Sequence, residues 1–150
     1  MPLAFRDATA ADLPAVVALL SDDALGAARE GAPGDPAYAR AFAAMQAQGG
    51  ANRLLLALDG AQVVGCLQLV LIPGLSHRGT LRAELESVRT ASARRGEGIG
   101  AALVAHALAE ARAAGAGLAQ LTSNAARADA HRFWERCGFA RSHAGFKMPL

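Results

Sequence analysis

The sequence predicts a mixed α/β fold around a mostly antiparallel sheet. Three features support this: apolar residues recur at strand spacing in some segments and at helix spacing in others, Asp59-Gly60 separates two apolar runs as a hairpin turn does, and a glycine-rich turn joins a strand to a helix. Hydrophobic residues make up 53% of the 150 residues, which is enough for the core of one domain over residues 1–150.

The first third of the chain predicts one strand and two helices. Residues 3–8 alternate weakly and predict a short strand. Residues 10–23 predict a helix because Leu13, Val16, Val17 and Leu20 recur at helical spacing, and a second helix is expected over residues 36–48. The segment between them, residues 26–35, is rich in glycine and proline and is expected to be a loop.

The rest of the chain predicts five strands and two helices. Strands over 53–58 and 62–72 should pair antiparallel, and a strand over 80–90 should place Arg82, Glu84, Glu86 and Val88 on one face. A helix over 98–114, a strand over 118–122, a helix over 126–137 and a last strand over 139–150 follow. The expected element order is therefore β-α-α-β-β-β-α-β-α-β.

Charge and composition exclude several classes of protein. The formal net charge is only +2 and the basic residues form no extended cluster, so a nucleic-acid partner is not expected. The apolar runs are too short to span a bilayer, and the N-terminus lacks the layout of a signal peptide, which predicts a cytoplasmic protein with no membrane partner. Cys66 and Cys137 form no CxxC motif and the histidines lack ligand spacing, so no metal site is expected.

The segment RRGEGIG carries the clearest binding signal. Gly96, Gly98 and Gly100 stand between a strand and a helix, where glycine lets backbone N–H groups approach phosphate oxygens and the helix dipole favours negative charge. Arg94 and Arg95 add positive charge. A dinucleotide-binding oxidoreductase is an alternative because GxGxxA also fits, but the tight strand-to-helix turn and the acidic residue that binds ribose are both missing.

The spacing Arg95-x-x-Gly98-x-Gly100 resembles the acyl-CoA pyrophosphate motif of the GNAT superfamily of N-acetyltransferases. The segment NAARADAHRFWERCGF is similar to the second motif of that family, in which an Asn precedes a helix that ends in an aromatic pair and Gly-Phe. The expected element order matches the GNAT fold, and the resemblance covers most of the chain. It implies a twisted sheet in which two strands splay apart around acetyl-CoA.

The resemblance also implies the function and the site. It implies transfer of acetyl from acetyl-CoA to the primary amine of a small molecule or peptide by direct attack, and it allows a homodimer. Glu84 and Glu86 are the candidate bases, with Glu84 favoured by its position in the triplet Ala83–Leu85. The residues implied in cofactor binding are Val88, Thr90, Arg94, Arg95, Gly96, Gly98, Ile99, Gly100, Asn124 and Phe133.

Trp134 departs from the family pattern. The family commonly has a tyrosine there that protonates the leaving thiolate, and an indole N–H cannot release its proton near neutral pH. A thiol is a tolerable leaving group, so an enzyme remains the leading hypothesis. The alternative is a non-catalytic acyl-CoA-binding or regulatory module.

Overall fold

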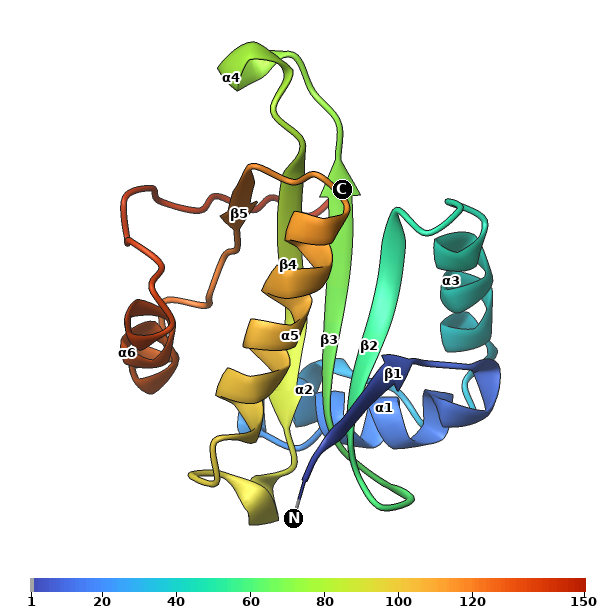
Figure 1. Ribbon diagram of the computed structural model, residues 1–150. Coiled ribbons are helices and arrows are strands. Elements are labelled where there is room, and N and C mark those ends of the chain that lie inside the picture. Colours follow the sequence, from blue (N-terminus) through green and yellow to red (C-terminus); the bar gives the residue numbers. More distant parts are fainter. Residues whose placement is uncertain (1) are drawn as a thin grey trace.

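The fold is described by a computed structural model that covers residues 2–150 (Figure 1). One five-stranded open sheet has the order β1-β2-β3-β4-β5. Each of the first four strands is antiparallel to its neighbours in that series, and β5 runs parallel to β4. The strands are β1 (Ala4–Asp7), β2 (Asn52–Asp59), β3 (Gln62–Ile72), β4 (Arg82–Thr90) and β5 (Leu118–Gln120).

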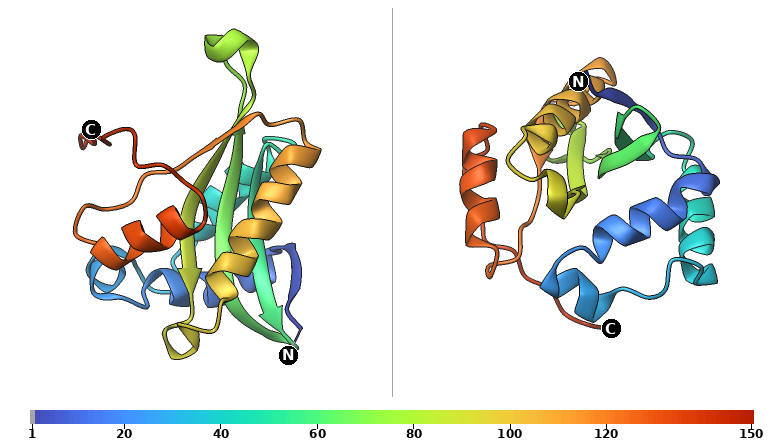
Figure 2. Two further views of the ribbon diagram at one scale, coloured as in Figure 1. Left: turned by 60° about the vertical axis from the view of Figure 1, so that its left-hand side comes forward. Right: turned by 90° about the horizontal axis from the view of Figure 1, so that it is seen from below.

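Helices cover both faces of this sheet (Figures 1 and 2). Helix α5 packs on β3 and β4 from one side, whereas α1 contacts β3 and β4 and α3 contacts β2 from the other. The helices are α1 (Leu13–Leu20), α2 (Ala24–Arg29), α3 (Pro36–Gln46), the single turn α4 (Ser76–Gly79), α5 (Ile99–Ala113) and α6 (Ala128–Arg136), with 3-10 turns at Ala10–Asp12 and Ser92–Arg94. None of the helices within residues 2–150 is long and apolar enough to cross a membrane.

Two hydrophobic clusters hold the layers together. Leu55 and Leu56 are neighbours on β2 and are both fully buried, but Leu55 packs under α5 and Leu56 packs in the cluster with Val16 and Phe42. A strand whose side chains alternate between two covered faces needs a continuous apolar run rather than an alternating pattern. The sequence LLLAL of β2 meets this requirement.

The expected hairpin is confirmed, since β2 and β3 pair from Asp59 and Gln62 outward. The expected alternation along β4 is wrong after Glu86. Ser87 has φ 51°. Glu86 pairs with Gln68 and Arg89 pairs with Cys66, so three residue steps along β4 lie opposite two along β3. This β-bulge shifts the side-chain alternation by one residue, so Val88 packs in the cluster under α5 instead of sharing a face with Glu86.

Two other expectations differ from the structure. Part of the expected loop at residues 26–35 belongs to α2, because the side chain of Asp23 caps this helix by accepting a hydrogen bond from the Gly26 amide at 2.6 Å. The last strand, expected over 139–150, does not form. Phe146 and Leu150 alternate as in a strand, but they are fully exposed with no neighbouring strand to complete a ladder within residues 2–150.

Candidate active site

The candidate site lies where β4 and β5 separate. The parallel pairing of these strands ends at Glu84 and Gln120, and β4 continues to Thr90 with no partner on that side among residues 2–150. Backbone groups on such an edge are free to bond an extended ligand. Val88 and Thr90, expected to contact the cofactor, both belong to this open stretch of β4.

The start of α5 has the geometry of a phosphate cradle. Gly98 caps the helix in the left-handed conformation with φ 80°, and Gly96 also has positive φ. A Cβ at Gly100 would lie only 3.3 Å from Thr90 Oγ1 and 3.4 Å from the ring of Phe133, so glycine allows β4, α5 and α6 to meet closely here. Ile99 is buried and anchors the first turn of α5 in the core. The open amides at this helix start suit the pyrophosphate of acetyl-CoA.

The two arginines of the glycine turn are engaged differently. Arg94 donates to Glu97 at 2.7 Å and to Asp59 at 3.0 Å, so its guanidinium fixes the turn to the β2–β3 hairpin. Arg95 is exposed and donates to the carbonyl of Asp22 at 3.0 Å, which leaves most of its guanidinium available to an anion. Arg95 is therefore the freer of the two arginines to bind an anion.

The second motif supplies the aromatic wall of the site. Phe133 and Trp134 on α6 stack edge to face with ring centroids 5.0 Å apart, and Trp134 meets Phe139 in the same way at 5.5 Å. Both α6 rings pack on the cluster under α5 and are half-buried. Asn124 lies in the loop before α6, where its side chain accepts from the amide of Ala126 at 2.9 Å.

Glu84 and Glu86 lie together beside the separation of the strands. Glu84 accepts a hydrogen bond from Gln120 Nε2 at 2.7 Å, which ties it to β5. Burial, followed by the negative charge and hydrogen bonding of Glu84, raises the pKa of Glu86, and Lys147 acts in the opposite direction. A carboxyl with a raised pKa beside an open strand edge suits a general base.

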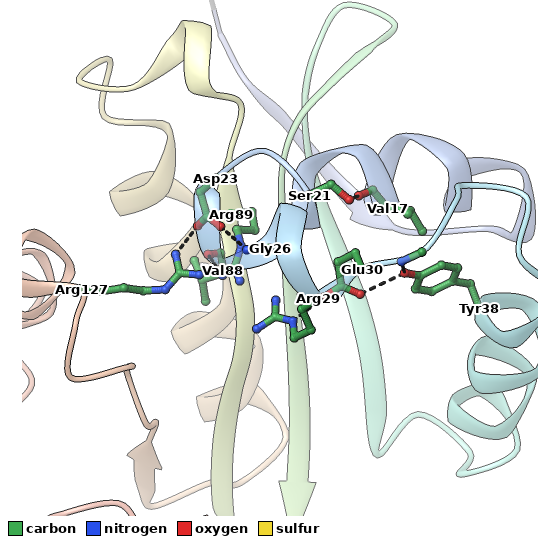
Figure 3. A network of polar contacts seen from close by, with 11 residues as sticks. Val17, Ser21, Asp23, Gly26, Arg29, Glu30, Tyr38, Val88, Arg89 and Arg127 are labelled. Carbon is green, nitrogen blue, oxygen red and sulfur yellow. Dashed lines mark hydrogen bonds and ion pairs between the residues drawn. The ribbon is translucent and has the colours of Figure 1, made fainter.

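A polar network that the sequence did not predict lies on the α1 side of β4 (Figure 3). Arg29 of α2, Arg89 of β4 and Arg127 before α6 gather around two carboxylates, Asp23 and Glu30. All of the 15 basic residues except Lys147 are arginine, and no motif in the sequence singled out these three. Only folding brings these three segments together.

An apolar cavity of ≈ 100 Å³ adjoins this network. It lies between the helices α1 and α3 and the sheet, and Ser87, Gln68 and Cys66 line its sheet side. Tyr38 lines it on the α3 side and donates to Glu30 at 3.0 Å, so the cavity and the polar network share a wall. Burial raises the pKa of the Cys66 thiol to about 12, which leaves it protonated and unreactive near neutral pH.

The open strand edge, the glycine turn and the paired carboxylates lie together at one end of the β4–β5 pairing. The model of the acetyltransferase (GNAT) family matches residues 14–139, and the chain belongs to this family. Membership of this family argues against the alternative of a dinucleotide-binding oxidoreductase.

Individual relatives include two acetyltransferases and one protein described as a transcriptional regulator. The chain is 40% identical over 95 residues to aminoalkylphosphonate N-acetyltransferase of Salmonella typhimurium (strain LT2), a match that covers 63% of this chain and 61% of that protein, less than two thirds of its length. A solved structure from Bacillus halodurans C-125, described as a transcriptional regulator, is 42% identical with a TM-score of 0.95, and the match covers 99% of this chain and 100% of that one. A structure assigned as an acetyltransferase from Agrobacterium tumefaciens str. C58 is 29% identical with a TM-score of 0.85, and the match covers 98% and 99%.

Proposed function

We propose that this protein transfers an acetyl group from acetyl-CoA to a primary amine by direct attack, with no covalent enzyme intermediate. The observation that carries the proposal is the separation of β4 from β5 after Glu84, which opens a strand edge beside two carboxylates. Acetyl-CoA supplies an activated acetyl group as a thioester. The chain has to hold that group, orient the amine and accept its proton.

The binding of acetyl-CoA is assigned to the cradle and the open edge. The amides at the start of α5, with Gly96, Gly98 and Gly100, would bind the pyrophosphate, and Arg95 would add charge. Val88 and Thr90 would bond the pantetheine arm, with Phe133 as its apolar wall and Asn124 beyond it. Arg94 would act mainly by holding the turn, because both of its carboxylate partners are already in place.

Glu86 is our proposed base. It precedes the bulge directly and lies past the last paired residues of β4 and β5, whereas Glu84 is within the pairing and bonded to Gln120. An amine with a pKa near ~10 must lose a proton before it attacks, and a carboxylate can accept it directly or through water. Glu84 would act through Glu86, by raising its pKa and so its basicity.

The remaining groups fit direct attack. The amide of Val88 would donate to the thioester carbonyl, and such a donor is worth ~3 kcal/mol where negative charge develops. Burial raises the pKa of both Cys66 and Cys137, which disfavours a thiolate that could carry the acetyl group.

Acetyl transfer to a panel of primary amines tests this proposal. We expect release of free CoA thiol and an N-acetylated product of matching mass from at least one class of amine. Calorimetry with acetyl-CoA supplies the binding control. Tight binding of acetyl-CoA with no acetylated product from any amine would show that the protein is not an acetyltransferase.

Trp134 favours a second candidate, a non-catalytic acyl-CoA-binding module that acts in regulation. It stands where the family commonly has its tyrosine acid, and a protein 42% identical to this chain is described as a transcriptional regulator. Trp134→Tyr separates the candidates, with Trp134→Phe as the control that lacks a hydroxyl. A several-fold increase in kcat for Trp134→Tyr alone identifies an enzyme that lacks its acid, and the absence of transfer in all three proteins supports the module.

A further inference from the structure

Arg89 is the unusual residue of the network around Asp23. It lies on β4, is half-buried, and donates through Nη1 to the carbonyl of Val88 at 3.0 Å. Its Nε is buried and has no hydrogen-bond partner among residues 2–150. An unpaired buried donor is costly, and the Nε edge of a guanidinium is one of those that bind carboxylate and phosphate oxygens in a bidentate way.

The charges around Arg89 leave a positive excess. Asp23 is in an ion pair with Arg127 and also accepts from the amide of Gly26, while Glu30 accepts from Arg29 Nε at 2.6 Å and from Tyr38. Each carboxylate therefore already has an ion pair with its own arginine, whereas Arg89 forms no ion pair within residues 2–150 and only lies near the charges of Asp23 and Glu30. Burial first, and then the positive charge of Arg127, lower the pKa of Arg89; Asp23 acts in the opposite direction and Arg29 adds a smaller lowering effect. The net direction is downward, and a bound anion would relieve this destabilisation of the charged form.

Arg89 and the proposed base face the same side of β4. Arg89 pairs with Cys66 and Glu86 pairs with Gln68, and both β3 partners line the apolar cavity on the α1 side of the sheet. The bulge at Ser87 is what brings this about, because an odd step along a regular strand would put the two side chains on opposite faces. Three residues of strand span about 10 Å at most, a distance that two long side chains can close around a small molecule.

We propose that Arg89, with Arg29 and Arg127, binds the acidic group of the acceptor, and that the acceptor is a short aminoalkyl acid. This inference rests on the proposed acetyl transfer and adds the class of acceptor. The acidic group lies on the Arg89 guanidinium, the short alkyl chain lies over Ser87 beside the apolar cavity, and the amine reaches Glu86. Phosphonate, phosphate and carboxylate share the anionic oxygens that this site recognises.

Matched acceptors test the inference by activity. 2-Aminoethylphosphonate, O-phosphoethanolamine and β-alanine differ only in the acidic group, and 2-aminoethanol is the neutral control. We expect kcat/KM for the best acid to exceed that for 2-aminoethanol by about 10- to 100-fold, the size of one charge-assisted interaction. The order among the three acids identifies the acidic group. Equal kcat/KM for 2-aminoethanol and the acids would overturn the inference and leave acetyl transfer intact.

Substitution of Arg89 tests the site itself. Arg89→Met keeps the length and loses the charge, so it should raise KM for the acids about 10- to 100-fold and reduce their advantage over 2-aminoethanol in kcat/KM by the same factor. Arg89→Lys should recover part of the loss, since it restores charge without the bidentate edge. Arg112→Met, on the exposed side of α5, is the matched control and should behave as the wild type. Unchanged KM in Arg89→Met would overturn the inference.

Binding without turnover separates the inference from the proposed function. Calorimetry of 2-aminoethylphosphonate with the protein saturated in CoA measures the acceptor site alone, and the affinity of each variant for CoA reports that it is folded. Binding that depends on Arg89, with no acetyl transfer, would support the anion site and contradict the proposed activity. Acetyl transfer with no difference in acceptor binding between wild type and Arg89→Met would support the proposed activity and contradict the anion site.

Discussion

At the scale of single residues, the two acidic side chains of β4 differ in ways that their spacing does not reveal. Glu84 and Glu86 are both strand carboxylates two positions apart, and the family resemblance favours Glu84. In the folded protein Glu84 is bonded to Gln120 and Glu86 carries the raised pKa. A tertiary contact, not the residue type, distinguishes the candidate base from its neighbour.

Glu86→Gln should lower kcat/KM about 10²- to 10⁴-fold, the usual contribution of a general base. The base works only when ionised, and its pKa is raised, so kcat/KM of the wild type should rise with pH through a limb that lies above the ordinary glutamate value of ~4.3. The limb should vanish in Glu86→Gln. A pH series of kcat/KM for both proteins is the measurement.

Glu84→Gln is the informative comparison for that series. Loss of its negative charge should lower the pKa of Glu86 and move the limb to lower pH without abolishing it. Glu135→Gln, an exposed carboxylate on α6, should leave the profile unchanged. If the limb instead disappears in Glu84→Gln and persists in Glu86→Gln, Glu84 is the base.

At the scale of elements, the junction of β4 and α5 depends on backbone conformations that only some residues tolerate. Ser87 and Gly98 both have positive φ, but the sequence predicts this only for Gly98. Glycine is the usual residue in the left-handed conformation, and serine is not. The glycine turn was therefore predictable, whereas the bulge that directs Arg89 to the α1 side was not.

Gly98→Ala should destabilise the protein by about 1–2 kcal/mol, because alanine is strained at φ 80°, although no atom lies within 4 Å of a Cβ placed there. It should also weaken acetyl-CoA binding, since the same backbone forms the cradle. Denaturant unfolding and calorimetry measure the two effects.

Gly74→Ala is the control for that substitution. Its Cβ would also meet nothing within 4 Å, and its φ is not positive. We expect a change within about 0.5 kcal/mol and unaltered acetyl-CoA binding. Equal effects of the two substitutions would contradict the assignment of strain and cradle to Gly98.

At the scale of the whole molecule, the sheet is covered on both faces, and each face carries a different part of the proposed site. The cluster under α5 supports the proposed cofactor cradle and the aromatic side chains of α6. The cluster with Val16 and Phe42 supports the cavity and the arginine network. The bulged strand β4 lies between the two sides, so the proposed acetyl donor and acceptor would meet there.

Leu55→Ala and Leu56→Ala test this two-sided core. Both side chains are completely buried on opposite faces of β2, so each substitution should cost about 2–5 kcal/mol in the free energy of unfolding. Leu75→Ala, at a 94% exposed position, should change it by less than about 0.5 kcal/mol. A near-zero cost for Leu56→Ala, measured by denaturant unfolding, would contradict the cover provided by α1 and α3.

The sequence by itself determined what depends on local chemistry: the strand runs and helical periods, the hairpin at Asp59-Gly60, and the glycine turn that begins α5. Periodicity and glycine encode such features within a few residues of chain. Tertiary structure decided the rest, because it depends on contacts between distant segments. The alternating tail at Phe146 has no strand to pair with among residues 2–150, and the bulge at Ser87 places Arg89 on the same face as Glu86. Folding also brings together three arginines from α2, β4 and the loop before α6.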